Sequence, residues 1–394
     1  MKLIRLVLTL AVYFTLLSCS TNTKEIVVSP DPVDSVKEDT EETEEEEDDD
    51  ESGNEEQTYE PAEGKPSAAL SSCSPENDIL YDAPVNNNIH EVNLSEFDMG
   101  DWQLVDELSD EFDYAAGKTA SVFLSKWKFG FVNNYTGPAP TQWSGDQITF
   151  ETLEGANRAI VLTPSETGTG ANRTLKCGMI SSKAKSSYPI FQEAKVKISN
   201  SQLANAVWML SGESGTTEEI DNLEAYGPRL RPDNTLCDYP YYADRIHLSH
   251  HTFKTVGGQR MDYQPKIQTW MSRKKTEGDC SRDNEVVWSE DYHYFGVKWV
   301  NEQRLEYFVD GKRVKVVTGL RVKDGIDPES YTACNGLTRE MHMIISQAAQ
   351  AWRYGGATNF WNSSDIKTGP NAKMYVDWIR VYSPTGTVNN RSCN

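Results

Sequence analysis

The sequence lacks the short motifs that mark several large classes of enzyme. It contains no Gly-rich phosphate-binding loop, no Gly-x-Ser-x-Gly turn and no His-Glu-x-x-His pair, so nucleotide, serine-hydrolase and zinc-peptidase chemistry has no support from motifs. No Cys-x-x-Cys pair or His/Cys cluster has the spacing of a zinc site, and we expect no metal at a catalytic centre. Long segments with helical periodicity are scarce, and no internal repeat is evident.

Basic charge is also in short supply. The 394 residues contain 38 Lys and Arg against 60 Asp and Glu, a formal net charge of −22. Residues 1–65 alone hold 19 acids and 5 bases, which leaves 41 acids and 33 bases in the rest of the chain. An acidic tail is therefore joined to a nearly ordinary domain that offers no basic patch for phosphates. We expect no nucleic-acid partner.

The apolar run at the N-terminus is too short for a transmembrane helix. Residues 6–17 supply about a dozen mostly apolar residues, where a bilayer core of roughly 30 Å needs about 20. Lys2 and Arg5 precede this run and Leu-Leu-Ser-Cys19 ends it, which predicts a signal peptide over residues 1–18. The ending resembles the lipobox of bacterial lipoproteins, which implies lipidation of the Cys19 thiol. An ordinary signal peptide is the alternative.

The residues after this cysteine predict a tether. Ser20, where some lipoproteins have Asp, resembles the signal for transfer to the outer membrane. We therefore expect an exported protein that faces the cell surface and meets the membrane through its lipid only. Residues 19–72 are poor in apolar side chains and include the unbroken acidic run Glu44–Glu51. Such a segment cannot offset its chain entropy by burial, and self-repulsion extends it. A disordered tether is favoured over a specific binding segment.

The remainder predicts one folded domain. We expect an N-terminal extension at residues 73–97, a single domain at 98–386 and a short tail at 387–394. Six cysteines remain after the lipidated one, and an even number in an exported chain permits up to three disulfides. The pairing stays open. These residues are Cys73, Cys177, Cys237, Cys280, Cys334 and Cys393.

Short β-type runs broken by Gly, Pro, Asn and Asp fill this domain. The Asp310-Gly311 dipeptide between two of them predicts a hairpin. Many short strands favour an all-β sandwich of two antiparallel sheets, a jelly roll, over any α/β fold. The predicted strands are Gln147–Thr152, Ala159–Thr163, Glu193–Ile198, Ala206–Leu210, His293–Val300, Leu305–Val309, Lys312–Val317, Met341–Ile345 and Met374–Tyr382.

A further stretch, residues 208–227, holds three acids that carry the chemistry. Glu219 and Asp221 share a face of a regular strand, whereas Glu224 falls on the other face. One extra residue between Asp221 and Glu224, a β-bulge, would bring all three acids to one face. Their carboxyl groups could then approach the separation of about 5–5.5 Å that is typical of a retaining glycosidase.

The spacing also suggests a role for each acid. Repulsion among three carboxylates raises the pKa of one of them, which can then act as a general acid near neutral pH. Glu219 would be the nucleophile, Glu224 the acid and then the base, and Asp221 would orient the nucleophile. A solvated acidic edge strand is the alternative.

This stretch resembles the catalytic strand of glycoside hydrolase family 16, whose bulged form is Glu-x-Asp-x-x-Glu, and the following Glu-Ala-Tyr-Gly resembles the agarase branch. Similar segments run over roughly residues 100–384, among them Trp102–Tyr114, Gln350–Arg353 and Tyr375–Tyr382. The resemblance implies a β-jelly roll with an open concave cleft and internal, retaining cleavage of a red-algal galactan. It implies no required cofactor and allows a structural Ca²⁺ whose ligands the sequence does not identify. We expect a monomer.

The resemblance also points to residues that contact the sugar. Trp208, just before the acids, is the best platform, because sugar C–H groups stack on aromatic faces. Trp143 and Trp352 are further platforms, with a place in the core as the alternative for each, and Trp378 is expected in the core. The remaining candidates are His247, with metal binding by the neighbouring histidines as its alternative, Arg353, with a structural ion pair as its alternative, and Tyr135, which stands where the cleft loop often has Trp.

Some positions depart from the agarase pattern. Residues 346–349, Ser-Gln-Ala-Ala, lack the acids that agarases usually place there, and Glu218 adds a fourth acid beside the nucleophile. Loss of a carboxylate at residues 346–349 would tolerate a sulfate better, so a porphyran or another sulfated galactan is an alternative substrate. A non-catalytic surface glycan-binding lipoprotein is a second alternative, although such a protein could dispense with the acids. Transglycosylation also stays open, since retaining chemistry accepts a sugar in place of water.

Overall fold

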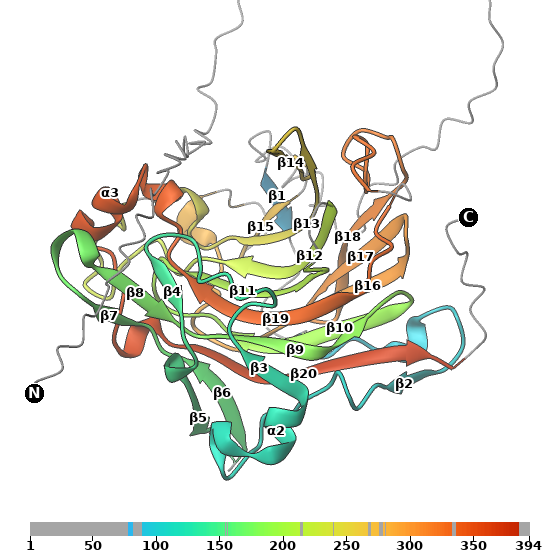
Figure 1. Cartoon of the computed structure of the whole chain (residues 1–394), viewed down its shortest axis with the longest axis horizontal. Helices are drawn as coiled ribbons and strands as arrows, with labels where there is room; N and C mark the ends of the chain where they lie inside the picture. The colour runs from blue at the N-terminus through green and yellow to red at the C-terminus, as the bar shows by residue number, and fades with distance from the viewer. Residues whose placement is uncertain are drawn as a thin grey trace, which may run out of the picture. The chain divides into compact units, whose positions relative to one another are not determined.

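Two large sheets dominate the computed structural model (Figure 1). The structure describes residues 78–81 and 89–385, except residues 154, 156, 213–215, 239, 267–268, 276–278, 280 and 333–335. The predicted signal peptide, the tether with Cys19 and the predicted tail at 387–394 lie outside these residues. No helix among the described residues is long and apolar enough to cross a membrane.

The first sheet, which we call the cleft sheet, has nine strands. Its order is β1-β15-β13-β12-β11-β19-β9-β3, with β14 paired to β13. All its pairings are antiparallel except β1 with β15. The strands are β1 (Asp78–Tyr81), β3 (Trp127–Phe129), β9 (Met179–Ser186), β11 (Ala204–Leu210), β12 (Thr216–Ala225), β13 (Ile246–Val256), β14 (Gln259–Tyr263), β15 (Trp270–Arg273) and β19 (Met341–Ala348).

The second sheet, which we call the outer sheet, has eight antiparallel strands. Its order is β18-β17-β16-β10-β20-β6-β5, with β2 paired to β20. Its strands are β2 (Trp102–Leu104), β5 (Ile148–Thr152), β6 (Arg158–Leu162), β10 (Ile190–Lys197), β16 (His293–Asn301), β17 (Arg304–Val309), β18 (Lys312–Thr318) and β20 (Met374–Pro384). A small third sheet contains β4 (Thr141–Trp143), β7 (Ser165–Thr167) and β8 (Thr174–Cys177). The α-helices within the described residues are α2 (Ser121–Lys126) and α3 (Ala357–Asn362).

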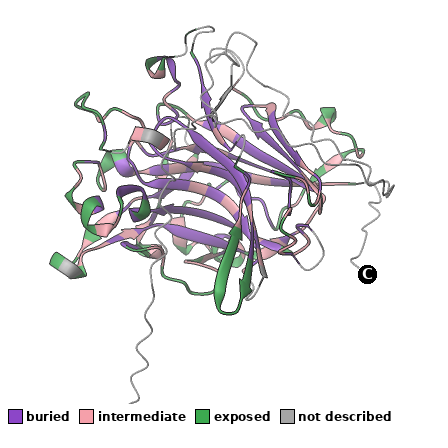
Figure 2. Ribbon diagram, turned by 90° about the horizontal axis from the view of Figure 1, so that it is seen from above, coloured by how far each residue is buried: buried purple, intermediate pink, exposed green. Residues whose placement is uncertain are grey.

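The main core lies between the two large sheets. Val207 and Met209 of β11 and Ile220 of β12 are buried there together with Ala194 and Val297 of the outer sheet. Alternate residues of β11 and β12 point the opposite way, as the period of two in a strand requires. Buried residues accordingly run through both sheets (Figure 2), and the cleft sheet is left with a second face that is free to carry function.

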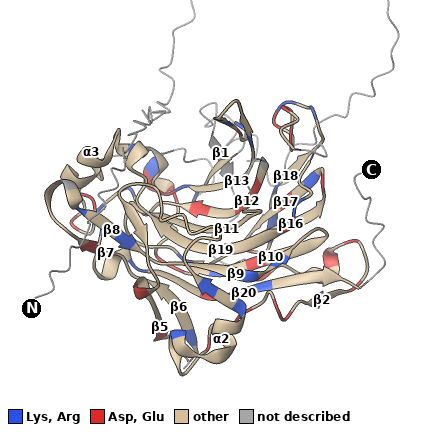
Figure 3. Cartoon of the chain, viewed as in Figure 1, with Lys and Arg blue, Asp and Glu red and all other residues tan. Residues whose placement is uncertain are grey.

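The structure confirms the predicted fold class. Each of the nine predicted strands is present, several of them extended by a few residues. Asp310 and Gly311 form the predicted hairpin turn with φ values of 50° and 83°, a left-handed pair that suits the twist of the flanking strands. Trp378 is buried, as expected. Lys and Arg are interspersed with Asp and Glu over the strands (Figure 3).

Two of the six candidate disulfide cysteines lie in the described residues. Cys177 and Cys237 are buried free thiols, so neither forms a disulfide in this structure. The expectation of disulfides is therefore not met at these two positions. Cys73, Cys280, Cys334 and Cys393 lie outside the described residues.

Candidate active site

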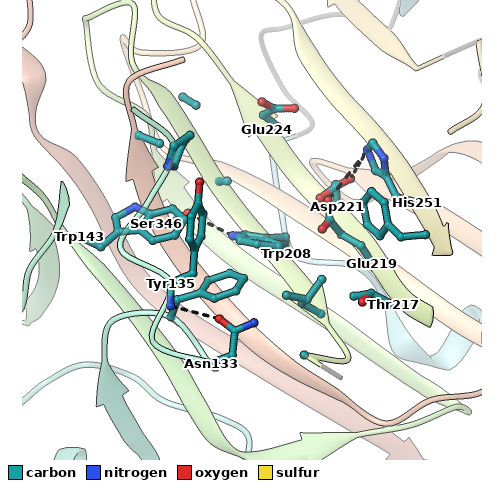
Figure 4. Close-up of a pocket in the computed structure, with 18 of the residues that line it drawn as sticks. Asn133, Tyr135, Trp143, Trp208, Thr217, Glu219, Asp221, Glu224, His251 and Ser346 are labelled. Carbon is teal, nitrogen blue, oxygen red and sulfur yellow. Dashed lines mark hydrogen bonds and ion pairs between the residues drawn. The ribbon is translucent and has the colours of Figure 1, made fainter. Parts of the chain in front are cut away.

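The predicted bulge is present in β12. Across the β12–β13 ladder Asp221 pairs with Ser249 and Glu224 pairs with His247, so three steps on one strand meet two on the other. This extra residue turns Glu224 to the same side as Glu219 and Asp221, and all three acids line one cleft of about 730 Å³ (Figure 4).

The fourth acid of the strand points the other way. Glu218 is fully buried and accepts hydrogen bonds from the backbone N–H groups of Thr338 and Arg339 at 2.7 and 2.8 Å. Strand alternation separates it from Glu219, so its role is structural. The sequence suggested a fourth charge beside the nucleophile, and the structure places that charge on the opposite face.

Aromatic rings form one part of the cleft wall. The Phe131 and Trp143 rings stack with centroids 5.4 Å apart, and Tyr135 meets Trp143 edge-on. Trp208 rises from β11 beside the acids, and its indole Nε1–H donates a hydrogen bond to Ser346 Oγ at 3.1 Å (Figure 4). Flat apolar rings next to carboxylates suit a ligand with both C–H faces and hydroxyl groups, as a sugar has.

The cleft runs over β11, β12, β13 and β19 of the cleft sheet. The loop after β3, with Phe131 and half-exposed Tyr135, supplies the aromatic wall together with Trp143 at the end of β4. The complete lining is Phe131, Asn133, Tyr135, Pro138, Trp143, Ala204, Ala206, Trp208, Leu210, Gly212, Thr217, Glu219, Asp221, Glu224, His251, Phe253, Thr255, Arg260, Ser346, Ala348 and Gln350.

Burial sets the protonation of the first two acids. It raises the pKa of Glu219 to about 7, against the opposing effect of the nearby His251 charge. Burial and the charge of Glu219 together raise the pKa of Asp221 well above its usual range. The two neighbouring carboxyl groups therefore both resist ionisation, and Asp221 is the one that favours its protonated form more strongly.

Glu224 has a different environment. Burial would raise the pKa of Glu224, but hydrogen bonds with His247 and Tyr226 outweigh it and lower the pKa. Tyr226 Oη–H donates to Glu224 Oε1 at 2.8 Å, and His247 Nδ1 lies 3.1 Å from Glu224 Oε2. From the sequence we expected a raised pKa at Glu224, the proposed general acid. The structure puts the raised values on Glu219 and Asp221, because the two partners of Glu224 favour its charged form.

Three predicted substrate contacts lie outside the cleft lining. His247 is buried behind Glu224 and stacks on Trp270 with ring centroids 4.5 Å apart. Arg353 is also buried, with its guanidinium 3.6 Å from the centre of the Tyr226 ring and its Nη1 donating to the Gln202 carbonyl. In these positions His247 and Arg353 support Glu224, directly and through Tyr226.

Trp352 is the third predicted substrate contact that lies outside the cleft lining. It is 47% exposed and packs edge-on against Tyr242, but it is not among the residues that line the cleft. The structure therefore brings together Trp208, Trp143 and Tyr135 with the acids. It leaves Trp352 exposed outside the lining, with its indole N–H donating to the lining residue Gln350 at 3.0 Å.

Sequence reasoning assigned no role to His251. This residue lines the cleft, and its Nδ1 lies 2.9 Å from Asp262 Oδ1 of β14. The sequence did contain a signal for His251. Positions 247 and 251 are four apart on one strand, so both side chains share a face of that strand. One atom each of Glu219, Asp221 and His251 lies within 4.8 Å of the others, a spacing at which a cation could be held. Because two of these groups are the acids of the bulged motif and Asp262 already holds the imidazole, we assign the cluster to acid–base chemistry.

Comparison with known proteins agrees with the geometry. The family described as "Beta-porphyranase A-D, GH16 domain" matches residues 102–384. The chain belongs to glycoside hydrolase family 16. It is thus a glycosidase, and its two antiparallel sheets are the jelly roll of this family.

Curated relatives of this family 16 chain include several beta-agarases. It is 35% identical to a beta-agarase of Phocaeicola plebeius over 72% of its own length and 85% of that protein's, and 33% identical to beta-agarase B of Zobellia galactanivorans over 71% and 77%. It is 38% identical to beta-agarase AgaA of Microbulbifer thermotolerans over 72% of its length, but spans only 59% of that relative.

Solved structures of the family superpose on the same region. Beta-agarase A of Zobellia galactanivorans gives a TM-score of 0.59 at 31% identity, covering 77% of this chain and all of that one. An inactivated mutant of beta-agarase B in complex with agaro-octaose gives 0.57 at 31% identity, covering 73% and 95%.

Proposed function

We propose that this chain is an endo-acting, retaining glycoside hydrolase that cleaves β-1,4 linkages of a red-algal galactan of the agar type. The observation that carries the proposal is the bulge in β12, which turns Glu219, Asp221 and Glu224 into one open cleft beside the Trp208 ring. The beta-agarase relatives support the choice of galactan.

The reaction uses the acids in two displacements. The Glu219 carboxylate attacks the anomeric carbon while Glu224 gives a proton to the departing glycosidic oxygen. Because the pKa of Glu224 is lowered in the free protein, this step proceeds through the minor fraction in which Glu224 is protonated. The covalent glycosyl-enzyme is then hydrolysed by water, from which Glu224 takes a proton as base. Asp221, whose raised pKa keeps it protonated, has the role of a hydrogen-bond donor that orients the nucleophile.

His247 and Tyr226 prepare Glu224 for both steps. Their hydrogen bonds hold the carboxyl group in place and stabilise its charged form after it has released the proton. Burial lowers the pKa of His247 and outweighs the neighbouring Glu224 charge, which raises it. The imidazole is therefore favoured in its neutral form.

A sulfated galactan such as porphyran is the second candidate substrate. Ser346 brings a hydroxyl group to the cleft beside Trp208, in the segment that has no acid. Arg260 lines the cleft with its guanidinium 3.9 Å from the centre of the Phe253 ring. A cation in the cleft and the missing acid both favour an anionic substituent, and the matching family is named for porphyranases.

The test is a panel of agarose, porphyran and other galactans with sizing of the products. An endo-acting retaining agarase releases a ladder of even-numbered oligosaccharides from agarose, and proton NMR of the first products shows the β-anomer. Inactivity on every galactan would contradict the proposal, and binding without product release would favour the glycan-binding alternative. Oligosaccharides longer than the substrate would reveal transglycosylation.

We also propose export and lipid anchoring at Cys19 on the outer membrane, with a monomeric enzyme at the cell surface. Support comes from the basic start, the apolar run and the Leu-Leu-Ser-Cys19 ending. Metabolic labelling with an alkyne fatty acid should mark the wild-type protein and not Cys19→Ala. A structural Ca²⁺ stays a prediction, which thermal unfolding with and without a chelator tests.

A further inference from the structure

His251 faces the nucleophile from the neighbouring strand. It is the direct register partner of Glu219 in the β12–β13 ladder. Its Nε2 lies 3.8 Å from Asp221 Oδ2 and 4.0 Å from Glu219 Oε1, on the cleft side of the sheet (Figure 4). The Nε2 atom of His251 therefore lies about equally close to both acids.

The other ring nitrogen is fixed by an acid from outside the motif. Asp262 lies on β14, which a turn through Gly257 and Gly258 joins to β13, and its Oδ1 is 2.9 Å from His251 Nδ1. The side chain of Asp262 is 45% exposed, whereas that of His251 is 14% exposed. A carboxylate on the solvent side thus holds a largely buried imidazole against the two catalytic acids.

This environment favours the charged imidazolium. Burial alone would lower the pKa of His251, but the hydrogen bond with Asp262 and the charges of Glu219 and Asp221 outweigh it and raise the pKa to about 9. The charged and titratable groups that act on this cluster come from every neighbouring strand: Glu219, Asp221 and Glu224 on β12, His247 and His250 on β13, Arg260 and Asp262 on β14, Tyr307 on β17 and Lys315 on β18.

The two acids beside it need such a cation. Glu219 has to be ionised to act as a nucleophile, yet burial and the neighbouring acids oppose its ionisation. A positive charge at about 4 Å acts strongly in a site of reduced dielectric constant. The nearest other cations on the described strands are less direct, since Arg260 packs on Phe253 and Lys315 donates to the Leu248 carbonyl in the core.

We propose that His251, held as a cation by Asp262, is a positioning residue that keeps Glu219 ionised while Asp221 stays protonated. This inference rests on the proposed function for the roles of the two acids. The acid trio is thus joined by a pair of residues, Asp262 and His251. This pair acts through the nucleophile and takes no part in bond making. Its chemistry is purely electrostatic: no bond to His251 forms or breaks during the reaction.

The kinetic test compares His251→Asn with His251→Arg over a pH range. Without the cation Glu219 ionises only at higher pH, so the acidic limb of kcat/KM should move up by about one pH unit or more in His251→Asn. His251→Arg restores a positive charge and should bring the limb back toward the wild-type position. The matched control is His342→Asn on β19, which should leave the limb where it is. The Nδ1 of His342 contacts the Ser182 carbonyl, and no acid among the described residues pairs with this ring.

A second measurement does not depend on any galactan. NMR titration of ring-labelled histidine in the free protein should show His251 protonated up to about pH 9 in the wild type, and losing its proton at lower pH in Asp262→Asn. Titration of ¹³C-labelled glutamate carboxyls, with Glu219→Gln to assign the signal, should show Glu219 ionising at higher pH in His251→Asn than in the wild type.

These outcomes separate the two proposals. An acidic limb and a Glu219 titration that are unchanged in His251→Asn would overturn the role of His251, even if that variant were slower or less stable. A neutral His251 at pH 7 would also overturn it. A wild-type protein that cleaves no galactan but shows both NMR shifts would contradict the proposed function and leave the electrostatic pair in place.

Discussion

The indole Nε1–H of Trp208 donates a hydrogen bond to Ser346 Oγ at 3.1 Å, between two neighbouring strands of the cleft floor. This contact fixes the ring beside the acids, so the platform is ordered before a sugar arrives. A preordered ring loses little conformational freedom on binding.

The Trp208 platform predicts a graded loss of activity. Trp208→Ala should lower kcat/KM on the best galactan by about 10- to 100-fold, since a stacking surface is lost, and Trp208→Phe should fall in between. Ser346→Ala should raise KM by about fivefold, the size of one hydrogen bond near 1 kcal/mol, with little change in kcat. Equal activity of Trp208→Ala and wild type would show that the ring is not a platform.

Arg260 provides a prediction about the substituents of the substrate. If the galactan carries sulfate, Arg260→Gln should lower kcat/KM on the sulfated polymer by about tenfold or more, because a charge-assisted hydrogen bond is lost. Activity on unsulfated agarose should fall much less, because there Arg260 acts only through the effect of its charge on Glu219. Arg260→Lys, which keeps the charge, is the matched control. Equal effects on both polymers would remove the support that Arg260 gives to a sulfated substrate.

Glu193 predicts how stability depends on pH. This residue of β10 is almost fully buried and accepts a hydrogen bond from the Val92 N–H at 3.2 Å. Burial raises the pKa of Glu193 from its ordinary value of 4.5 to about 8. The folded protein holds this proton in a range where the unfolded chain has released it, so the contribution to stability is complete below pH 4.5 and is lost as pH rises toward 8.

Glu193→Gln removes this dependence. Thermal unfolding should give a Tm for the variant at least about 2 °C above wild type at pH 8.5 and no difference at pH 4, since one kcal/mol shifts Tm by about 2–4 °C at this size. Glu193 belongs to the outer sheet and does not line the cleft, so the rate of product release serves as the control. A difference in Tm that is the same at both pH values would contradict the assignment.

We expect the two buried thiols, Cys177 and Cys237, to react slowly with alkylating reagents. Burial raises the pKa of Cys177 to about 12 and that of Cys237 to about 11, so few thiolates form at neutral pH. Iodoacetamide should label neither residue in the native protein and both after unfolding, as peptide mass spectrometry can measure. Labelling of neither thiol after unfolding without reductant would show that they are in fact disulfide-bonded.

The fold and the acid trio could be predicted from the sequence because both depend on local patterns. Short alternating runs indicated the strands, and the extra residue between Asp221 and Glu224 indicated the bulge that the β12–β13 register contains. These are properties of one strand and its period of two, so they need no knowledge of which strands pair.

The partners of the acids could not be predicted in this way. His251 meets Glu219 only because β13 returns beside β12 in one register, and Asp262 joins them through a further hairpin. Arg353 ends the segment Gln350–Arg353, which suggested a sugar contact, yet it lies under Tyr226. The short helix η7 (Ala351–Tyr354) turns Arg353 inward, while Trp352 points outward. Such placements depend on tertiary packing, which neither period nor spacing determines.

The central claim is that Glu219 in the bulged strand is the nucleophile of a galactan hydrolase. The most direct measurement compares product release from agarose and porphyran by wild type, Glu219→Gln and the neighbouring Glu218→Gln, together with binding to the same polymers. We predict that Glu219→Gln loses at least about a thousandfold in rate while binding stays within about threefold, and that Glu218→Gln stays active. Product release by Glu219→Gln at the wild-type rate would contradict the account.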